Sequence, residues 1–189
     1  MTPAEVRDLR DSLDKQGKKL VFTNGCFDLL HAGHVRYLNQ ARALGDAMVV
    51  ALNSDASVRE LKGPTRPINR ERDRAEVMAA LRAVDAVVIF SEPRATSLIE
   101  TIRPHVYAKG GDYTVDSLNP EEREALEKVG AEIKILSLVP GRSTTSITRP
   151  PSTRAVAITQ GPTSGENRTR LMKPWAAAPI TASVCTIIF

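Results

Sequence analysis

Two histidines, His31 and His34, lie three residues apart in the segment 23–34 of this sequence. At that spacing on a helix, both imidazole rings can face the same side. Gly33 lies between them and has no side chain, so a phosphate group could approach the backbone there. A helix start also offers free N–H groups and the positive end of the helix dipole, which favour an anion. The pattern predicts a phosphate site at which two imidazoles donate to oxygens that gain negative charge in a transition state.

Two histidines at this spacing could instead lie on an exposed helix surface. Considered alone, that is the commoner situation. Here the pair directly follows a predicted strand and the dipeptide Phe27-Asp28. That context favours the phosphate site.

A second phosphate-binding pattern lies near the end of the regular part of the sequence, in the segment 141–147. Hydroxyl and backbone N–H groups at a helix start suit the outer phosphates of a nucleoside triphosphate. A Ser/Thr run alone more often caps a helix, but beside the histidine pair the phosphate interpretation is favoured. The candidate residues are Arg142, Ser143, Thr144 and Thr145.

The elements that must position these residues alternate along the first 147 residues. Uninterrupted apolar runs are typical of strands buried on both faces of a parallel sheet. The predicted strands are Leu20–Thr23, Met48–Leu52, Ala86–Phe90, Val106–Ala108 and Ile133–Leu136. Their alternation with helices predicts an α/β, Rossmann-like fold, a parallel sheet with helices on both faces. Because such sheets bind ligands at the carboxyl ends of their strands, the exit of the first strand, 24–34, is the predicted site.

Apolar residues at helical spacing predict the helices between these strands. One helix covers 32–44, another covers 71–83, and a short one is bracketed by Asn119 as N-cap and Gly130 as C-cap. The stripes expected to face the core are Val35, Leu38, Ala41 and Leu44 on the first of these, and Val77, Ala80, Leu81 and Val84 on the second. The polar stretch 53–69 contains two prolines and is expected to form a surface loop.

The chain divides by composition into a domain, 1–147, and an irregular, disordered tail, 148–189. The tail holds five prolines, ten Ser/Thr residues and five basic residues against one acidic residue, which gives it the whole net charge of +4. The other 21 basic and 21 acidic residues cancel. The domain therefore loses the main support for nucleic-acid binding, although a nucleic-acid binder that uses its basic tail stays a third alternative.

Several other classes of protein are excluded by the same sequence. No apolar run approaches the length of about 20 residues that a membrane span needs, and no signal peptide opens the chain, so a cytoplasmic protein is expected. The two cysteines, Cys26 and Cys185, form neither a disulfide framework nor a metal cluster. We expect no metal site built from protein ligands.

The histidine segment resembles the H-x-G-H signature of the nucleotidyltransferase superfamily that includes the glycerol-3-phosphate and choline-phosphate cytidylyltransferases. The resemblance covers residues 1–147, and the segment 141–147 resembles the second signature of that family. Three further stretches, 23–28, 61–69 and 109–114, are together similar to the adenylyltransferases of ADP-heptose synthesis in their stand-alone form. The sequence departs from the family at Pro150-Pro151, where a helix that normally continues is expected to end.

The resemblance implies transfer of AMP from ATP to D-glycero-β-D-manno-heptose 1-phosphate, a step toward the lipopolysaccharide core. It implies Mg²⁺ carried on the phosphates, a homodimer, and a separate heptose kinase that supplies the substrate. His31, His34 and Lys62 match catalytic positions, and Asp28 and Arg66 match substrate contacts, although Asp28 could instead hold the turn. The positions implied for nucleotide binding are Cys26, Phe27, Gly33, Arg74, Lys109, Gly110, Gly111, Asp112, Arg142, Ser143, Thr144 and Thr145.

Two alternatives within this resemblance stay open. One is a cytidylyltransferase that acts on glycerol 3-phosphate or a similar small phosphate. The other is a nucleotide-binding protein that is inactive because its carboxyl-terminal part departs from the family pattern.

Overall fold

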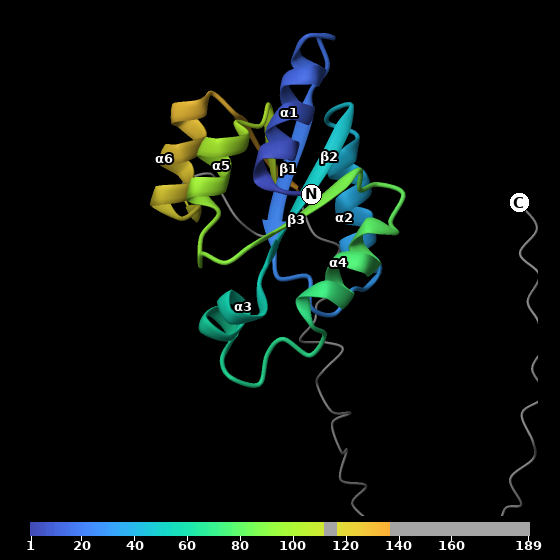
Figure 1. Cartoon of the computed structure of the whole chain (residues 1–189), viewed down its shortest axis with the longest axis vertical. Helices are drawn as coiled ribbons and strands as arrows, with labels where there is room; N and C mark the ends of the chain where they lie inside the picture. The colour runs from blue at the N-terminus through green and yellow to red at the C-terminus, as the bar shows by residue number, and fades with distance from the viewer. Residues whose placement is uncertain (112–116, 137–189) are drawn as a thin grey trace, which may run out of the picture. The chain divides into compact units, whose positions relative to one another are not determined.

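A five-stranded parallel sheet organises the computed structural model, which describes residues 1–111 and 117–136 (Figure 1). The strands are β1 (Leu20–Gly25), β2 (Ala47–Asn53), β3 (Ala86–Phe90), β4 (Val106–Gly110) and β5 (Glu132–Leu136). They lie in the order β3-β2-β1-β4-β5, and every neighbouring pair is parallel. The direction of the strand order reverses between β1 and β4, which makes the carboxyl end of this pair the topological switch point.

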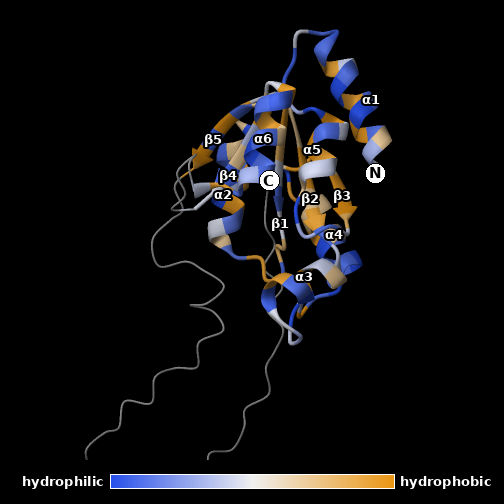
Figure 2. Cartoon of the chain, turned by 90° about the vertical axis from the view of Figure 1, so that its left-hand side faces the viewer, coloured by the Kyte–Doolittle hydropathy of each residue, from blue (hydrophilic) through white to orange (hydrophobic). Residues whose placement is uncertain are grey.

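Helices cover both faces of the sheet, as predicted. The helices α1 (Pro3–Asp14), α5 (Thr96–Ile102) and α6 (Pro120–Val129) pack on one face, and α2 (Ala32–Arg42) and α4 (Glu71–Ala79) pack on the other (Figure 1). Successive strand residues point to opposite faces, so Phe22 enters the first core and Val21 the second. Figure 2 shows the apolar strands between helices whose outer surfaces are hydrophilic.

The predicted signals at the ends of α6 are confirmed. The side chain of Asn119 accepts the N–H groups of Glu121 and Glu122, and Gly130 ends the helix in the left-handed conformation with φ 72°. All five predicted strands are also present. Their apolar runs are therefore sufficient to locate the sheet.

The predicted surface loop at 53–69 is wrong in its first half, because α3 (Asp55–Lys62) forms there. Ser54 caps this helix by accepting the N–H of Ser57, and Val58 is its one fully buried apolar residue. The helix spans only eight residues of a polar stretch that contains two prolines, so the composition of 53–69 suggested a loop. In Figure 1, α3 lies beyond the carboxyl ends of the strands.

The predicted core-facing stripes are partly wrong. Leu38 and Ala41 are buried on α2, but Val35 is 40% exposed and Tyr37 takes the inward position. On α4, Val77 is 53% exposed, whereas Arg74 and Met78 are buried. A buried tyrosine and a buried arginine are not expected from hydrophobic spacing, because each depends on polar partners that come from distant segments.

Within the described residues, no helix is long and apolar enough to cross a bilayer. The expected cytoplasmic location stays a prediction. The predicted tail, 148–189, lies outside the described residues, and so does its boundary with the domain.

Candidate functional site

The loop that leaves β1 turns sharply before it reaches α2. Phe27 adopts a φ of 43°, in the left-handed region that is rare for a residue with a large side chain, and it is nevertheless buried. Its ring meets the ring of His34 edge to face, with the centroids 5.5 Å apart. Backbone strain of this kind persists where surrounding contacts fix it, and it clusters at functional sites.

The structure brings His31 and His34 together at the start of α2. Their ring centroids lie 3.9 Å apart with an interplanar angle of 37°. His31 is the N-cap, and its Nδ1 accepts the N–H of Gly33 at 3.1 Å. An Nδ1 that accepts a hydrogen bond leaves the proton of the neutral ring on Nε2. His31 is therefore set up to donate from Nε2.

His34 is held neutral by its surroundings. Burial, and secondarily the neighbouring His31, lower its pKa to about 4. Its Nδ1 is buried and has no hydrogen-bond partner among the described residues. A buried polar atom without a partner calls for an explanation, and a role toward a ligand is one such explanation.

Gly33 was expected to leave its backbone open to a phosphate group. It is buried, and its N–H already has the His31 side chain as a partner. The predicted approach of a phosphate to this backbone is not tested by the structure and stays a prediction.

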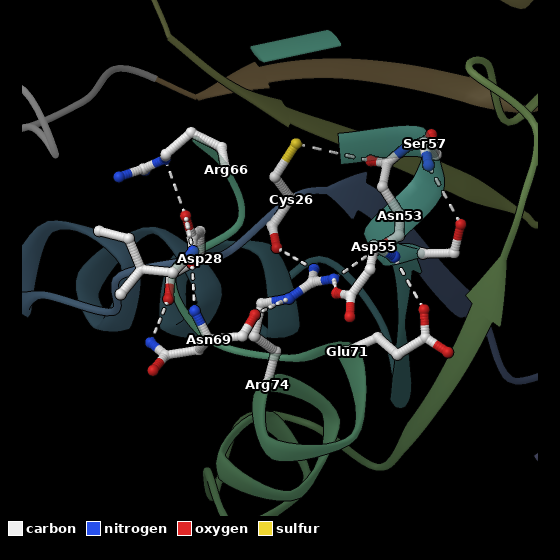
Figure 3. A network of polar contacts seen from close by, with 11 residues as sticks. Cys26, Asp28, Asn53, Asp55, Ser57, Arg66, Asn69, Glu71 and Arg74 are labelled. Carbon is white, nitrogen blue, oxygen red and sulfur yellow. Dashed lines mark hydrogen bonds and ion pairs between the residues drawn. The ribbon is translucent and has the colours of Figure 1, made fainter. Parts of the chain in front are cut away.

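Asp28 and Arg66, which the sequence assigned to substrate binding, contact each other. Figure 3 shows the Asp28 carboxylate facing Arg66, whose Nε lies 2.9 Å from Oδ2. The same carboxylate accepts the N–H groups of Ile68 and Asn69, at 2.8 Å and 3.0 Å. Asp28 is 6% exposed, so these contacts occupy it. The arrangement favours the alternative role of Asp28, which is to hold the loop 66–69 against the turn after β1.

Arg74 lies at the centre of the network in Figure 3 and is only 2% exposed. Its guanidinium donates to the carbonyl groups of Cys26, Asn53 and Asn69, at 2.6, 2.9 and 3.0 Å. It also forms an ion pair with Asp55 at 2.9 Å. Arg74 thus joins the loop after β1, the end of β2 and the start of α4. Its predicted contact with a nucleotide stays a prediction.

Lys62 and Cys26 lie on two segments that approach each other near this network. Lys62 is exposed at the end of α3, and its positive charge acts on the Cys26 thiol. Burial nevertheless raises the pKa of Cys26, and the charges of Lys62 and Arg74 offset this only in part. The thiol is therefore protonated near neutral pH and is no nucleophile.

Lys109 and Gly110 end β4, directly beside the end of β1. The Lys109 ammonium donates to the side-chain oxygens of Asn24 and Tyr107, both at 3.2 Å. A Cβ at Gly110 would lie 2.7 Å from the ring of Tyr37, so only glycine lets α2 approach β4 this closely. Gly111 follows with a φ of 145°.

Sequence reasoning missed three polar residues of this region. Tyr37 connects α2 to β1 and β4. Its hydroxyl lies 2.6 Å from Thr23 Oγ1 on β1 and donates to the carbonyl of Ala108 on β4 at 2.9 Å. Asn24 and Glu122 contact each other across 98 residues of sequence. No local pattern points to such a pair, although Asn24 stands within a segment that the family resemblance includes.

The other predicted residues, Asp112, Arg142, Ser143, Thr144 and Thr145, lie outside the described residues. Within the described part, no group of three His, Cys, Asp or Glu side chains could hold a metal ion. A hollow of about 640 Å³ opens between the starts of α3 and α4, lined by residues that include Ser54, Arg59, Arg70 and Ser91. The histidine pair does not line it.

The arrangement offers a specific chemistry. Two neighbouring imidazoles stand at a helix start and a topological switch point, and the Lys109 ammonium stands at the adjoining strand end. Such donors suit an oxyanion or a phosphate chain, and nothing in them resembles an activated nucleophile.

Comparison with known proteins gives consistent matches. A family model described as cytidylyltransferase-like matches residues 22–165, more than half of the chain. The bifunctional protein HldE of Syntrophotalea carbinolica is 50% identical over 142 residues, which are 75% of this chain and 29% of that protein. HldE of Pelobacter propionicus is 54% identical over 132 residues, 70% of this chain and 27% of that protein. The chain thus spans under a third of the length of these relatives.

Among solved structures, the lipopolysaccharide core biosynthesis protein from Thermoplasma volcanium superposes with a TM-score of 0.54 and 28% identity. The match covers 65% of this chain and 98% of that protein. The fold and the sequence therefore point to the same group of proteins.

Proposed function

Because the chain belongs to the cytidylyltransferase-like family of nucleotidyltransferases, we propose that it transfers AMP from ATP to a sugar 1-phosphate. The acceptor proposed is D-glycero-β-D-manno-heptose 1-phosphate, and the products are ADP-heptose and pyrophosphate. The observation that carries the proposal is the pair of imidazoles, His31 and His34, in contact at the start of α2 beside the switch point.

The proposed reaction is an in-line displacement. An oxygen of the sugar 1-phosphate attacks the α-phosphorus of ATP, the new P–O bond forms, and the bond to pyrophosphate breaks. A phosphate monoester is already ionised near neutral pH, so the attack needs no general base. Catalysis then consists of positioning and of stabilising charge on the phosphate oxygens.

His31 and His34 would donate hydrogen bonds to oxygens of the α- and β-phosphates. The neutral state of His34 fits a hydrogen-bond donor better than a proton source, because its pKa of about 4 leaves it uncharged near neutral pH. Lys62, at the exposed end of α3, would reach the outer phosphates. Asp28, Arg66 and Arg74 would keep the surrounding loops in place through the contacts described above.

Mg²⁺ would enter as part of the substrate, bound to the triphosphate. The carboxylates near the site already have partners, since Asp28 pairs with Arg66 and Asp55 pairs with Arg74. Mg²⁺ usually keeps several waters and takes phosphate oxygens as ligands, so this donor set fits a substrate-borne ion. The ion would neutralise charge on the phosphates.

The proposed acceptor rests on the similarity of 23–28, 61–69 and 109–114 to adenylyltransferases of ADP-heptose synthesis. It is supported by relatives named bifunctional protein HldE and by a structural neighbour described as a lipopolysaccharide core biosynthesis protein. In this proposal a separate heptose kinase supplies the sugar 1-phosphate. A homodimer, as in related enzymes, is expected.

A comparison of four substrate pairs tests the proposal. ATP and CTP are each supplied with heptose 1-phosphate and with glycerol 3-phosphate, and pyrophosphate release is measured. We expect release only with ATP and heptose 1-phosphate. A preference for CTP and glycerol 3-phosphate would instead establish the cytidylyltransferase alternative, and nucleotide binding without release in any pair would establish the inactive one.

Substitution of the histidines tests their role. His31→Ala and His34→Ala should each lower kcat by about 10²–10³, the usual cost of removing one donor to a developing oxyanion. Gln40→Ala, at an exposed position of the same helix, is the matched control and should keep full activity. A histidine variant that keeps more than half the activity would contradict the assignment.

A further inference from the structure

Glu122 is a buried carboxylate beside the ends of β1 and β4, and no role is assigned to it above. It stands in the first turn of α6 and is 4% exposed. Its Oε1 accepts the Asn24 amide at 3.1 Å and the N–H of Ala95 at 3.2 Å, and its Oε2 lies 3.9 Å from the Lys109 ammonium. Burying a charged group is costly unless it is paired, so these contacts account for its presence.

The chemistry of the three side chains fixes the direction of their hydrogen bonds. A carboxylate only accepts and an ammonium only donates. The Asn24 amide between them must therefore turn its NH₂ toward Glu122 and its oxygen toward Lys109. That oxygen also lies 2.7 Å from the hydroxyl of Tyr107, which in turn stands 3.2 Å from the Lys109 ammonium. Glu122 thus sets the orientation of the groups that hold Lys109.

Glu122 is also the carboxylate that balances Lys109 electrostatically. Burial lowers the pKa of Lys109 and the positive charge of Arg94, just before α5, lowers it further. Glu122 opposes both effects, and the Cys26 side chain adds a smaller effect in the same direction. The Cys26 thiol is itself protonated near neutral pH, because burial raises its pKa. Among the residues that the structure describes, the negative charge that faces Lys109 therefore comes from Glu122.

We propose that Glu122 is a positioning residue, which fixes the Lys109 ammonium at the switch point so that it can bind a phosphate of the substrates. This role rests on the proposed nucleotidyl transfer. Glu122 itself touches no substrate and acts through Lys109 and Asn24. Through Glu122 the helix α6 becomes part of the site, although it carries no catalytic residue.

The pH profile of Glu122→Gln tests the role, with Glu121→Gln as the control, since Glu121 is the exposed neighbour in the same helix turn. Without its counter-charge Lys109 loses its proton at lower pH, so the basic limb of kcat/KM should move to lower pH by about one unit. At neutral pH, kcat/KM should fall about tenfold or more. Lys109→Met should lower kcat/KM as much as Lys109→Met/Glu122→Gln does, because Glu122 acts through the lysine.

A thermal unfolding cycle keeps the test valid if Glu122→Gln is too unstable to assay. That variant leaves a buried ammonium without a counter-charge, and its melting temperature should fall by about 5 °C or more. Lys109→Met/Glu122→Gln removes the ammonium as well, so it should recover most of that loss and melt clearly above Glu122→Gln. This measurement needs no activity.

Two results would overturn the proposal. One is a folded Glu122→Gln enzyme whose pH profile and kcat/KM match those of Glu121→Gln. The other is a double variant that stays as unstable as Glu122→Gln, since Glu122 would then act only through the N–H of Ala95. If the unmodified chain transfers nothing in any of the four substrate pairs, the proposed function fails, and the thermal cycle still decides whether Glu122 holds Lys109.

Discussion

His34 is partly buried with an uncharged ring, and this should lower the free energy of unfolding in acid. Its pKa is about 4 in the folded chain and 6.5 as the ordinary value, so the unfolded chain binds the proton first as the pH falls. The free energy of unfolding should therefore decrease between about pH 6.5 and pH 4. After allowance for solvent screening, this contribution is of the order of 1–2 kcal/mol.

His34→Asn should lack that contribution, so its unfolding free energy should depend less on pH across the same window. Urea titrations at pH 4.5, 5.5 and 7.5 measure the difference, and the values above pH 7 serve as the internal control. Equal slopes for the two proteins would mean that His34 is not buried as a neutral ring. The same pKa implies that His34 causes no loss of activity above about pH 5.

At the scale of elements, Arg74 is the residue on which several loops depend. Arg74→Met removes three hydrogen bonds to carbonyl groups and leaves the Asp55 carboxylate without its partner. We expect the free energy of unfolding to fall by about 3–5 kcal/mol. Arg72→Met, at an exposed position of α4, should change it by less than about 0.5 kcal/mol. Urea unfolding followed by circular dichroism measures both, and similar losses would refute the central role of Arg74.

The close approach of α2 to β4 predicts a second effect. In Gly110→Ala the new methyl group would meet the Tyr37 ring, which both strands hold in place through its hydroxyl. Overpacking of this kind should cost about 1–3 kcal/mol of unfolding free energy. The cost should largely vanish in a Tyr37→Ala background. A double-mutant cycle of thermal unfolding tests this, and additive effects would contradict the contact.

The sequence predicted those elements whose local pattern is strong. The strands follow from uninterrupted apolar runs, and α6 follows from Asn119 and Gly130 at its ends. The helix α3 was missed because it is short and lies in a polar stretch with two prolines. Hydrophobic spacing also predicted some wrong core-facing residues on α2 and α4, because Tyr37 and Arg74 are buried there through polar partners.

The candidate site was predictable to a similar extent. The spacing of His31 and His34 already placed both rings on one side of a helix, and the structure brings them into contact. The contacts of Asp28 with Ile68, of Arg74 with Cys26 and of Lys109 with Asn24 were not predictable, because the partners lie 40, 48 and 85 residues away along the chain. Contacts over such separations depend on the folded topology, which leaves no periodic trace in a single sequence.

For the whole molecule, nucleotide binding should appear as added stability. A non-hydrolysable ATP analogue with Mg²⁺, at about 100 times its dissociation constant, should add about 2.7 kcal/mol to the unfolding free energy. EDTA should abolish part of that gain and should leave the melting temperature of the chain alone unchanged. A fall in melting temperature on adding EDTA without nucleotide would show a metal held by the protein itself.

The sheet separates two cores, and only one of them adjoins the histidines. The core beneath α1, α5 and α6 contains Phe22 and Tyr107, while the core beneath α2 and α4 contains Phe27 and Met78. Substitutions on opposite faces of the sheet share few neighbours, so their effects on the free energy of unfolding should add. Substitutions on the α1 side that leave Tyr107 and Glu122 unchanged should therefore alter stability without disturbing the histidine pair.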